Sequence, residues 1–408
     1  MSFSWPRPGE GVLNPLRIAY FSPLPPERSG IADYSRELLP HLAREAEIVL
    51  YAADPGIVDE EMRAQFEVRE LGHFRQERNQ FDVALYQMGN SEYHASIYPT
   101  LTHFPGVVVL HDYAIHHFIA HRTLIQGDFA GYAREMGYAL GAQGMHLAHA
   151  VHLGQAPSAA FEVALNDRLL DSSLGLIVHS AYVADKIRRR GFERPLMIIP
   201  AQIEERPGRS RRDDLKLEDD GVLFASFGMI TKQKQIEMAL RVFQRVRESI
   251  PDAHYLLVGE ALPEVDLQAI VAELGLVGSV THVGYVPDLD VFVDWLHTAD
   301  VVINLREPTV GETSATALRA MAAGRPLIVF DHGWYHEIPD EAALKTVPLD
   351  QELLLAAMLR LAQSPQMREQ MGQAGRRYTR EVCHPAAVAE ATIRALSATL
   401  DVYLKRYE

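Results

Sequence analysis

The sequence has one cysteine, Cys383, among its 408 residues. Without a second cysteine an intramolecular disulfide is excluded, and a reducing compartment is expected. No stretch has the ~18 uninterrupted apolar residues that a membrane-spanning helix needs. Residues 1–8 lack the apolar run of a secretion signal. We therefore expect a cytoplasmic protein.

The chain is also short of positive charge. It has 39 Lys and Arg against 54 Asp and Glu, which gives a formal net charge of -15. Because phosphate backbones require a basic surface, nucleic acid is not an expected partner. Basic residues cluster at 188–190 and 206–212. These are either solvated charges or a docking surface for the inner face of an anionic membrane.

What the sequence does have is an alternation of short β-branched runs with longer stretches of helical periodicity. This pattern is typical of parallel strands joined by crossover helices, an α/β fold. The first half has strand-like runs at 17–21, 47–51, 83–86, 107–110, 176–178 and 197–199. The second half has them at 222–227, 255–258, 280–283, 301–304 and 326–330.

Two domains are expected, because 408 residues exceed the size at which one core usually stops growing. The polar segment before the second series carries Pro207, Gly208 and charges of both signs without periodicity, as linkers do. The expected divisions are a first domain over 1–201 with a helical insertion near 115–151, a linker over 202–220, a second domain over 221–385, and a C-terminal helix over 386–408 that packs back on the first domain.

Ligands of open α/β sheets bind at the carboxyl ends of the strands, so the residues after each run are the candidates. Gly30 follows the first run in a proline-rich turn and lets backbone amides approach an anion where a helix begins. His111 and Asp112 follow the run 107–110, and an imidazole there could hydrogen-bond a sugar hydroxyl. Asn90, after the run 83–86, could contact a sugar or an acceptor.

A metal site is not expected, although histidines recur through the helical insertion. No acidic or cysteine partner accompanies them at a motif spacing. The histidines are His116, His117, His121, His146, His149 and His152.

The second series carries the stronger signals for phosphate binding. Gly228 ends its first strand, and Lys234 lies where a helix should begin and could hold a diphosphate. A loop rich in Gly, Glu, Thr and Ser opens the helix near 316–323, with amides and hydroxyls for phosphate at Thr313, Ser314 and Ala315. Tyr285 and Val286 could offer backbone groups to a nucleotide base. Arg319 lies along the same helix, and Glu312 could bind sugar or ribose hydroxyls.

In these motifs the chain resembles the retaining GT-B glycosyltransferases of family 4, from about residue 17 to the end. The resemblance lies in Gly30-Ile31, His111, the segment 178–183, the six-residue spacing from Gly228 to Lys234, and the segments 256–259, 283–286 and 320–326. It implies two Rossmann-like domains that face each other across a deep cleft. It also implies a histidine, His111, beside the donor sugar and a phosphate-binding lysine, Lys234.

Two departures from the family pattern concern the donor site. Met229 stands where the family usually has arginine, which leaves Lys234 with Lys232 or Arg306 as candidates for a second cation. The paired glutamates of the family fall at Gly311 and Arg319. Glu312, one residue beyond the first, could take over its role. Arg319 cannot accept hydrogen bonds from a ribose as a carboxylate does.

The resemblance implies transfer of a sugar, with retention of anomeric configuration, from a nucleotide-diphosphate sugar to a glycan or lipid-linked glycan. His111 and Glu312 would hold the sugar, and no cofactor or metal is expected. Two alternatives remain: a nucleotide-sugar epimerase of the same architecture, and a non-catalytic relative that binds a nucleotide sugar.

Overall fold

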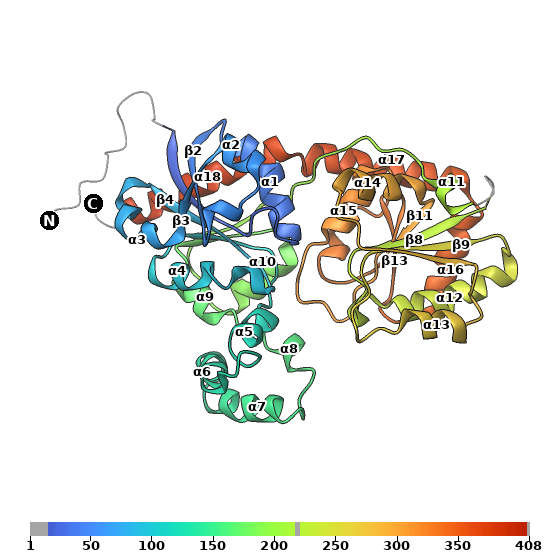
Figure 1. Ribbon diagram of the computed structural model, residues 1–408, viewed down its shortest axis with the longest axis horizontal. Coiled ribbons are helices and arrows are strands. Elements are labelled where there is room, and N and C mark those ends of the chain that lie inside the picture. Colours follow the sequence, from blue (N-terminus) through green and yellow to red (C-terminus); the bar gives the residue numbers. More distant parts are fainter. Residues whose placement is uncertain (1–14, 217–220, 406–408) are drawn as a thin grey trace.

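A computed structural model describes residues 15–216 and 221–405 of the chain. The start of the expected first domain, the last four residues of the expected linker and the end of the expected C-terminal helix lie outside the described residues. Two parallel sheets form two α/β domains side by side (Figure 1). The chain therefore has the expected fold class.

The first sheet has seven strands in the order β3-β2-β1-β4-β5-β6-β7. Its strands are β1 (Leu16–Phe21), β2 (Ala46–Ala52), β3 (Glu67–Glu70), β4 (Val83–Met88), β5 (Val107–Leu110), β6 (Gly175–Val178) and β7 (Leu196–Ile198). The second sheet has six strands in the order β10-β9-β8-β11-β12-β13. Its strands are β8 (Leu223–Phe227), β9 (His254–Val258), β10 (Val280–Gly284), β11 (Val301–Ile303), β12 (Leu327–Phe330) and β13 (Ala343–Thr346).

Helices cover both faces of each sheet. Those of the first half are α1 (Gly30–Leu42), α2 (Glu60–Gln65), α3 (Phe74–Glu77), α4 (Ile97–His103), α5 (His116–Arg122), α6 (Phe129–Leu140), α7 (Ala142–His152), α8 (Ala159–Glu162), α9 (Asp167–Ser172) and α10 (Ala181–Arg189). Those of the second half are α11 (Arg212–Leu215), α12 (Ile236–Ser249), α13 (Leu267–Glu273), α14 (Leu289–Thr298), α15 (Ala315–Ala322), α16 (Gln351–Ala362), α17 (Pro365–Val382) and α18 (Pro385–Leu404).

The central strands are apolar throughout because both of their faces are covered. In β1, Ala19 and Phe21 join the core on one face, whereas Ile18 and Tyr20 join the core on the other. In β8, Phe224 packs on one face and Leu223 on the opposite face. A continuous apolar run is therefore the signature of the inner strands.

Two edge strands, β3 and β13, escape the sequence prediction. β3 has the sequence EVRE and is half-exposed, and β13 is only four residues long. Neither has the apolar run that marks an inner strand, since an edge strand has a neighbour on one side only. The expected linker also differs, because it contains the short helix α11.

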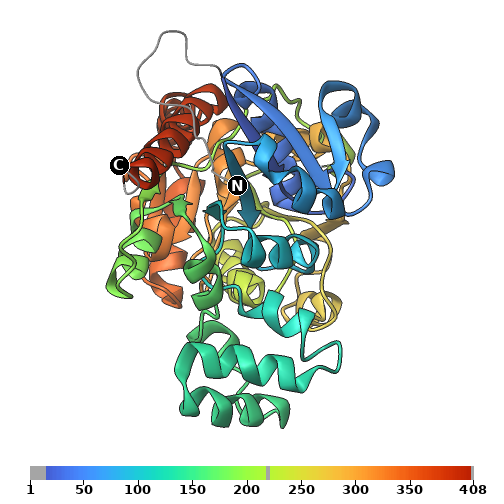
Figure 2. The same cartoon turned by 90° about the vertical axis from the view of Figure 1, so that its left-hand side faces the viewer.

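The C-terminal helix α18 completes the core of the first domain. Val388, Ala389 and Leu396 of α18 are buried in the same core as Ile18 and Tyr20 of β1. The chain thus crosses between the domains twice, and the crossings are joined where the amide of Ile203 donates to the carbonyl of Cys383 at 2.9 Å. Figures 1 and 2 both show α18 beside the first sheet and the helices α5 to α8 extending away from it.

The basic clusters of the sequence are largely paired with acids. Arg188 pairs with Asp185, and Arg190 pairs with Asp167. In the second cluster the partners are Asp290 for Arg206, Asp294 for Arg209, Asp214 for Arg211 and Asp300 for Arg212. These pairs favour solvated, locally neutralised charges. No helix within the described ranges is long and apolar enough to cross a membrane.

Candidate functional site

Lys234 lies at the carboxyl end of β8, in the short 3-10 turn Lys232–Lys234. Its ammonium donates to the carbonyl of Phe227, the last residue of β8, at 2.8 Å. Burial, and then the nearby guanidinium of Arg306, hold the pKa of Lys234 well below its usual value, whereas Glu312 acts in the opposite direction. A partly buried cation with so little compensating charge is suited to an anionic ligand.

Gly228 makes room for this lysine. Its φ of 81° is in the region that favours glycine, and a Cβ there would lie 2.6 Å from the Lys234 ammonium. A side chain at residue 228 would therefore displace the cation as well as strain the turn.

The helix α15 begins beside Lys234. Its cap is Ser314, whose hydroxyl accepts from the amide of Ala317 at 3.2 Å and donates to Asn304 at 3.1 Å. The Ser314 hydroxyl is therefore engaged in capping the helix, and its predicted contact with phosphate stays a prediction. The amides around Thr313 and Ala315 precede the first turn of the helix and remain suited to an anion.

Glu312 is held within its own loop. One carboxylate oxygen accepts from the Thr309 hydroxyl and from the amide of Val310, both at 2.8 Å. The other oxygen lies 2.8 Å from Nε of Arg306 in an ion pair. Hydrogen bonds within the loop thus fix one carboxylate oxygen of Glu312, and the other oxygen faces the Arg306 guanidinium.

This loop also contacts the first domain. The amide of Ala114 donates to the carbonyl of Val310 at 2.9 Å. At Gly311, which has a φ of 80°, a Cβ would lie 2.6 Å from the Cβ of Tyr113. The loop after β11 and the loop after β5 consequently meet across the two domains.

Asp112 is the carboxylate that the first domain brings to this meeting point. Its Oδ2 accepts from the amide of Asn90 at 2.8 Å. Burial, and to a lesser extent the charge of Glu312, raises the pKa of Asp112 to about 7, against the opposing effects of the Asn90 bond and Arg306. Asp112 and Glu312 therefore lie within electrostatic range of one another.

Asp112 gives the stability of the protein a specific pH dependence. Its folded pKa of about 7 lies above its ordinary value of 3.8, so the folded state holds one more proton between these values. Stability from this group is full below pH 4 and is lost as the pH rises toward 7, at about 1.4 kcal/mol per pH unit. Asp112→Asn keeps an acceptor for Asn90 and should remove this slope in urea unfolding measured from pH 4 to 8. An unchanged slope would contradict the assignment.

Asn90 itself serves the fold. Its side-chain oxygen accepts from the amide of Phe118 at 3.0 Å, and its side-chain nitrogen lies 3.0 Å from Nδ1 of His117. These bonds tie the turn after β4 to α5, and the contact of Asn90 with a sugar or an acceptor stays a prediction.

His111, which is predicted to lie beside the donor sugar, is bonded to side chains of its own domain. Its Nε2 is 2.8 Å from Oε1 of Gln87, and its Nδ1 is 3.2 Å from Nε2 of His179. His179 in turn reaches the carbonyl of Ile199 at 2.8 Å. Burial lowers the pKa of both imidazoles, that of His179 to about 4. Both ring nitrogens of His111 are thus occupied inside the first domain, directly before Asp112, and its contact with the donor sugar stays a prediction.

Gly30 and Tyr285 approach the site from opposite domains. Gly30 begins α1 after Ser29, which caps the amide of Ile31 at 3.2 Å, and a Cβ at Gly30 would meet no protein atom within 4 Å. The ring of Tyr285 is 44% exposed and has the guanidinium of Arg28 above it, 4.7 Å from its centroid. Val286 packs against the second-domain core instead.

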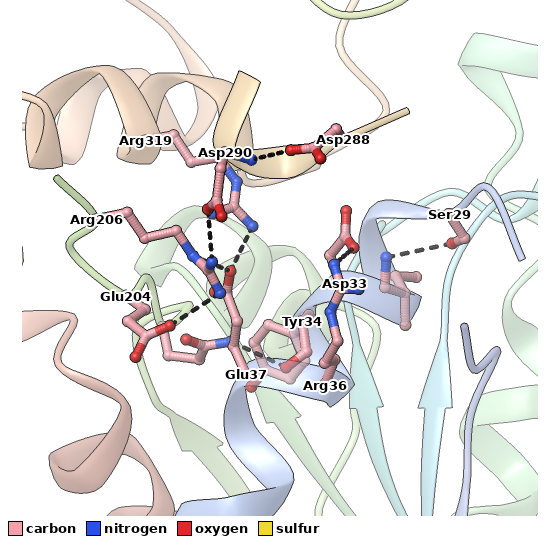
Figure 3. A network of polar contacts seen from close by, with 12 residues as sticks. Ser29, Asp33, Tyr34, Arg36, Glu37, Glu204, Arg206, Asp288, Asp290 and Arg319 are labelled. Carbon is pink, nitrogen blue, oxygen red and sulfur yellow. Dashed lines mark hydrogen bonds and ion pairs between the residues drawn. The ribbon is translucent and has the colours of Figure 1, made fainter. Parts of the chain in front are cut away.

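Arg319, which is predicted to contact the nucleotide, lies between the two domains. It is buried, and its guanidinium donates to Glu37 of α1 at 2.8 Å. Figure 3 shows Arg319 and Arg206 both directed at Glu37, with Asp290 and Glu204 around Arg206. Arg319 therefore joins the domains through an ion pair.

A second contact between the domains had no signal in the sequence. The carboxylate of Glu337 accepts from the amides of Ala181 and Tyr182 at 3.0 and 2.8 Å. A second-domain carboxylate thus caps the positive end of the first-domain helix α10. In the sequence, nothing distinguishes Glu337 from other glutamates, so this role could not be predicted.

The histidines of the insertion are used for packing. His116 bonds the carbonyl of Val163 and the hydroxyl of Tyr132, and His149 and His152 lie against the ring of Phe129. Within residues 15–216 and 221–405, no group of three or more His, Cys, Asp or Glu side chains could hold a metal ion.

Comparison with known proteins agrees with this arrangement. Residues 221–364 match the model of the family described as glycosyl transferases group 1. No curated protein has a significant sequence match to the chain. Three of the similar solved structures are a sucrose-phosphate synthase, WaaG and HepE.

The sucrose-phosphate synthase of Thermosynechococcus elongatus has a TM-score of 0.64 and 18% identity, over 96% of this chain and 100% of that one. WaaG, a glycosyltransferase of lipopolysaccharide biosynthesis, has a TM-score of 0.59 and 18% identity, over 92% of this chain and 99% of that one. HepE of Anabaena, solved with UDP-glucose, has a TM-score of 0.63 and 13% identity, over 94% of this chain and 100% of that one. The chain thus shares the GT-B fold of these glycosyltransferases, with two Rossmann-like domains.

Proposed function

We propose that the protein transfers a hexosyl group, with retention of anomeric configuration, from a nucleotide-diphosphate sugar to a glycan or lipid-linked glycan. One observation carries the proposal: the partly buried ammonium of Lys234 and the start of α15 lie together at the carboxyl ends of neighbouring parallel strands, β8 and β11. Fixed positive groups at that edge are suited to a diphosphate. HepE, which shares the fold, was solved with UDP-glucose.

In this proposal the donor diphosphate is the leaving group. Lys234 and the amides at Thr313 to Ala315 stabilise the charge that grows on it as the glycosidic bond breaks. Glu312 holds the donor sugar, and Asp112 faces it from the first domain. The departing phosphate takes the proton of the acceptor hydroxyl, so a separate base is not required. The fixed cations also make a metal ion unnecessary, and the reaction is placed in the cytoplasm.

A screen of nucleotide sugars by thermal shift tests the donor proposal. A ligand present at ~100 times its dissociation constant should stabilise the protein by about 2.7 kcal/mol. The donors that bind are then incubated with the enzyme, with and without a panel of glycan and lipid-linked acceptors. Transfer only with an acceptor, with the anomeric configuration kept, supports the proposal.

Three outcomes would contradict the proposed function. An isomerised sugar formed from donor alone would indicate an epimerase, and binding without any turnover would indicate a non-catalytic nucleotide-sugar-binding protein. If no nucleotide sugar shifts the unfolding temperature, the donor site itself is wrong.

A further inference from the structure

The loop after β8 provides one partly buried cation, although a diphosphate carries at least two negative charges. Met229, directly after Gly228, has a side chain that is 57% exposed. Lys232 is exposed as well, at the start of the turn that carries Lys234. The other candidate for the second positive charge, Arg306, lies in the loop after another strand.

Arg306 comes from the neighbouring strand. β11 pairs with β8 in parallel, so the residues that follow the two strands lie at one edge of the sheet. The Arg306 side chain is 23% exposed, and that of Glu312 is 11% exposed. The charge of Arg306 acts on Lys234, Glu312 and Asp112. Arg306 is thus the cation at the centre of this cluster.

The contact between Arg306 and Glu312 is close but poorly directed. Nε of Arg306 lies 2.8 Å from Oε1 of Glu312. Within the described chain, however, neither buried atom has a partner with hydrogen-bond geometry. The pair balances charge while leaving a donor and an acceptor unsatisfied, and such atoms gain from a better-aligned partner.

We propose that Arg306 is the second cation for the donor diphosphate, and that Glu312 is its counter-ion until the donor binds. This inference rests on the proposed function. A guanidinium matches phosphate oxygens with two parallel hydrogen bonds, so the diphosphate displaces the single carboxylate contact. Glu312 then turns the released oxygen to a hydroxyl of the donor sugar. Binding of the phosphates and placement of the sugar are coupled by this exchange.

Inorganic pyrophosphate is the probe, because it does not depend on the donor base or sugar. Its dissociation constant is measured by isothermal titration calorimetry on the full chain. Arg306→Met should weaken binding by ~10-fold or more, since a hydrogen bond to a charged group is lost. Lys232→Met, the matched control, should stay within ~2-fold of the unmodified protein. In Arg306→Met, the added change Met229→Arg should restore affinity to within ~3-fold.

Glu312→Gln should change the pyrophosphate affinity in the opposite direction. Without its counter-ion Arg306 is freed, so pyrophosphate should bind ~3-fold or more tightly, while sugar transfer should fall. A merely structural role for Glu312 would weaken both. If Arg306→Met does not fold, Arg306→Lys takes its place, with an intermediate loss expected because the lysine lacks the two-point contact.

The failures of the two proposals are distinguishable. Unchanged pyrophosphate affinity in Arg306→Met, or weaker affinity in Glu312→Gln, overturns the exchange but leaves a donor site at Lys234. Failure of the unmodified protein to bind any nucleotide sugar overturns the proposed function itself.

Discussion

Replacement of Lys234 by alanine should lower turnover by at least ~100-fold, because the variant loses the charge that meets the leaving diphosphate. The ammonium is held at 2.8 Å from the Phe227 carbonyl, so it is already positioned when the donor arrives. Turnover is measured at saturating donor, and Lys232→Ala serves as the control on the same turn. Equal loss in both variants, or no loss in Lys234→Ala, would remove this role.

Lys234→Met separates charge from packing. Because burial disfavours the charged lysine, the methionine variant should be at least as stable as the unmodified protein while sharing its loss of turnover. Donor affinity of the unmodified protein should fall as the pH rises through the lowered pKa of Lys234, since only the ammonium attracts phosphate. A methionine variant that keeps its activity would contradict the electrostatic role.

Replacement of Arg319 by alanine should be among the most destabilising single changes. The side chain of Glu37 is 1% exposed, and Arg319 is its nearest cation. Removing one partner of a buried pair costs about 3–5 kcal/mol because the other charge stays buried. Nε of Arg206 remains 3.9 Å from Glu37, so we expect the lower end of this range. Urea unfolding followed by intrinsic fluorescence measures the loss.

A double-mutant cycle tests whether the effect belongs to the pair. Glu37→Gln together with Arg319→Met removes both charges and should recover most of the stability lost in Arg319→Ala. Since the pair joins two domains, the first unfolding transition is compared in each variant. Additive losses in the cycle would mean that the two side chains act independently.

The sequence determined where the chemistry can occur. Inner strands are apolar on both faces, and each is followed at once by a polar junction, so Lys234, Glu312 and Asp112 could be placed at the carboxyl edges of two sheets. The edge strands β3 and β13 escaped this reasoning because both are only four residues long and carry charged or polar residues, as loops do. Short-range rules thus sufficed for the elements and the junctions.

Only the tertiary structure decided which side chains remain free at those junctions. His111 is engaged by a histidine 68 residues away, α10 by a glutamate 156 residues away, and Arg319 by a glutamate 282 residues away. A local pattern records the type of a residue and its position on a strand or helix. The partner of a buried charge is set by how two domains pack, because an unpaired charge there is too costly to persist. The sequence therefore placed candidate phosphate-binding residues at the strand ends, whereas domain packing determined the distant partners of His111 and Arg319.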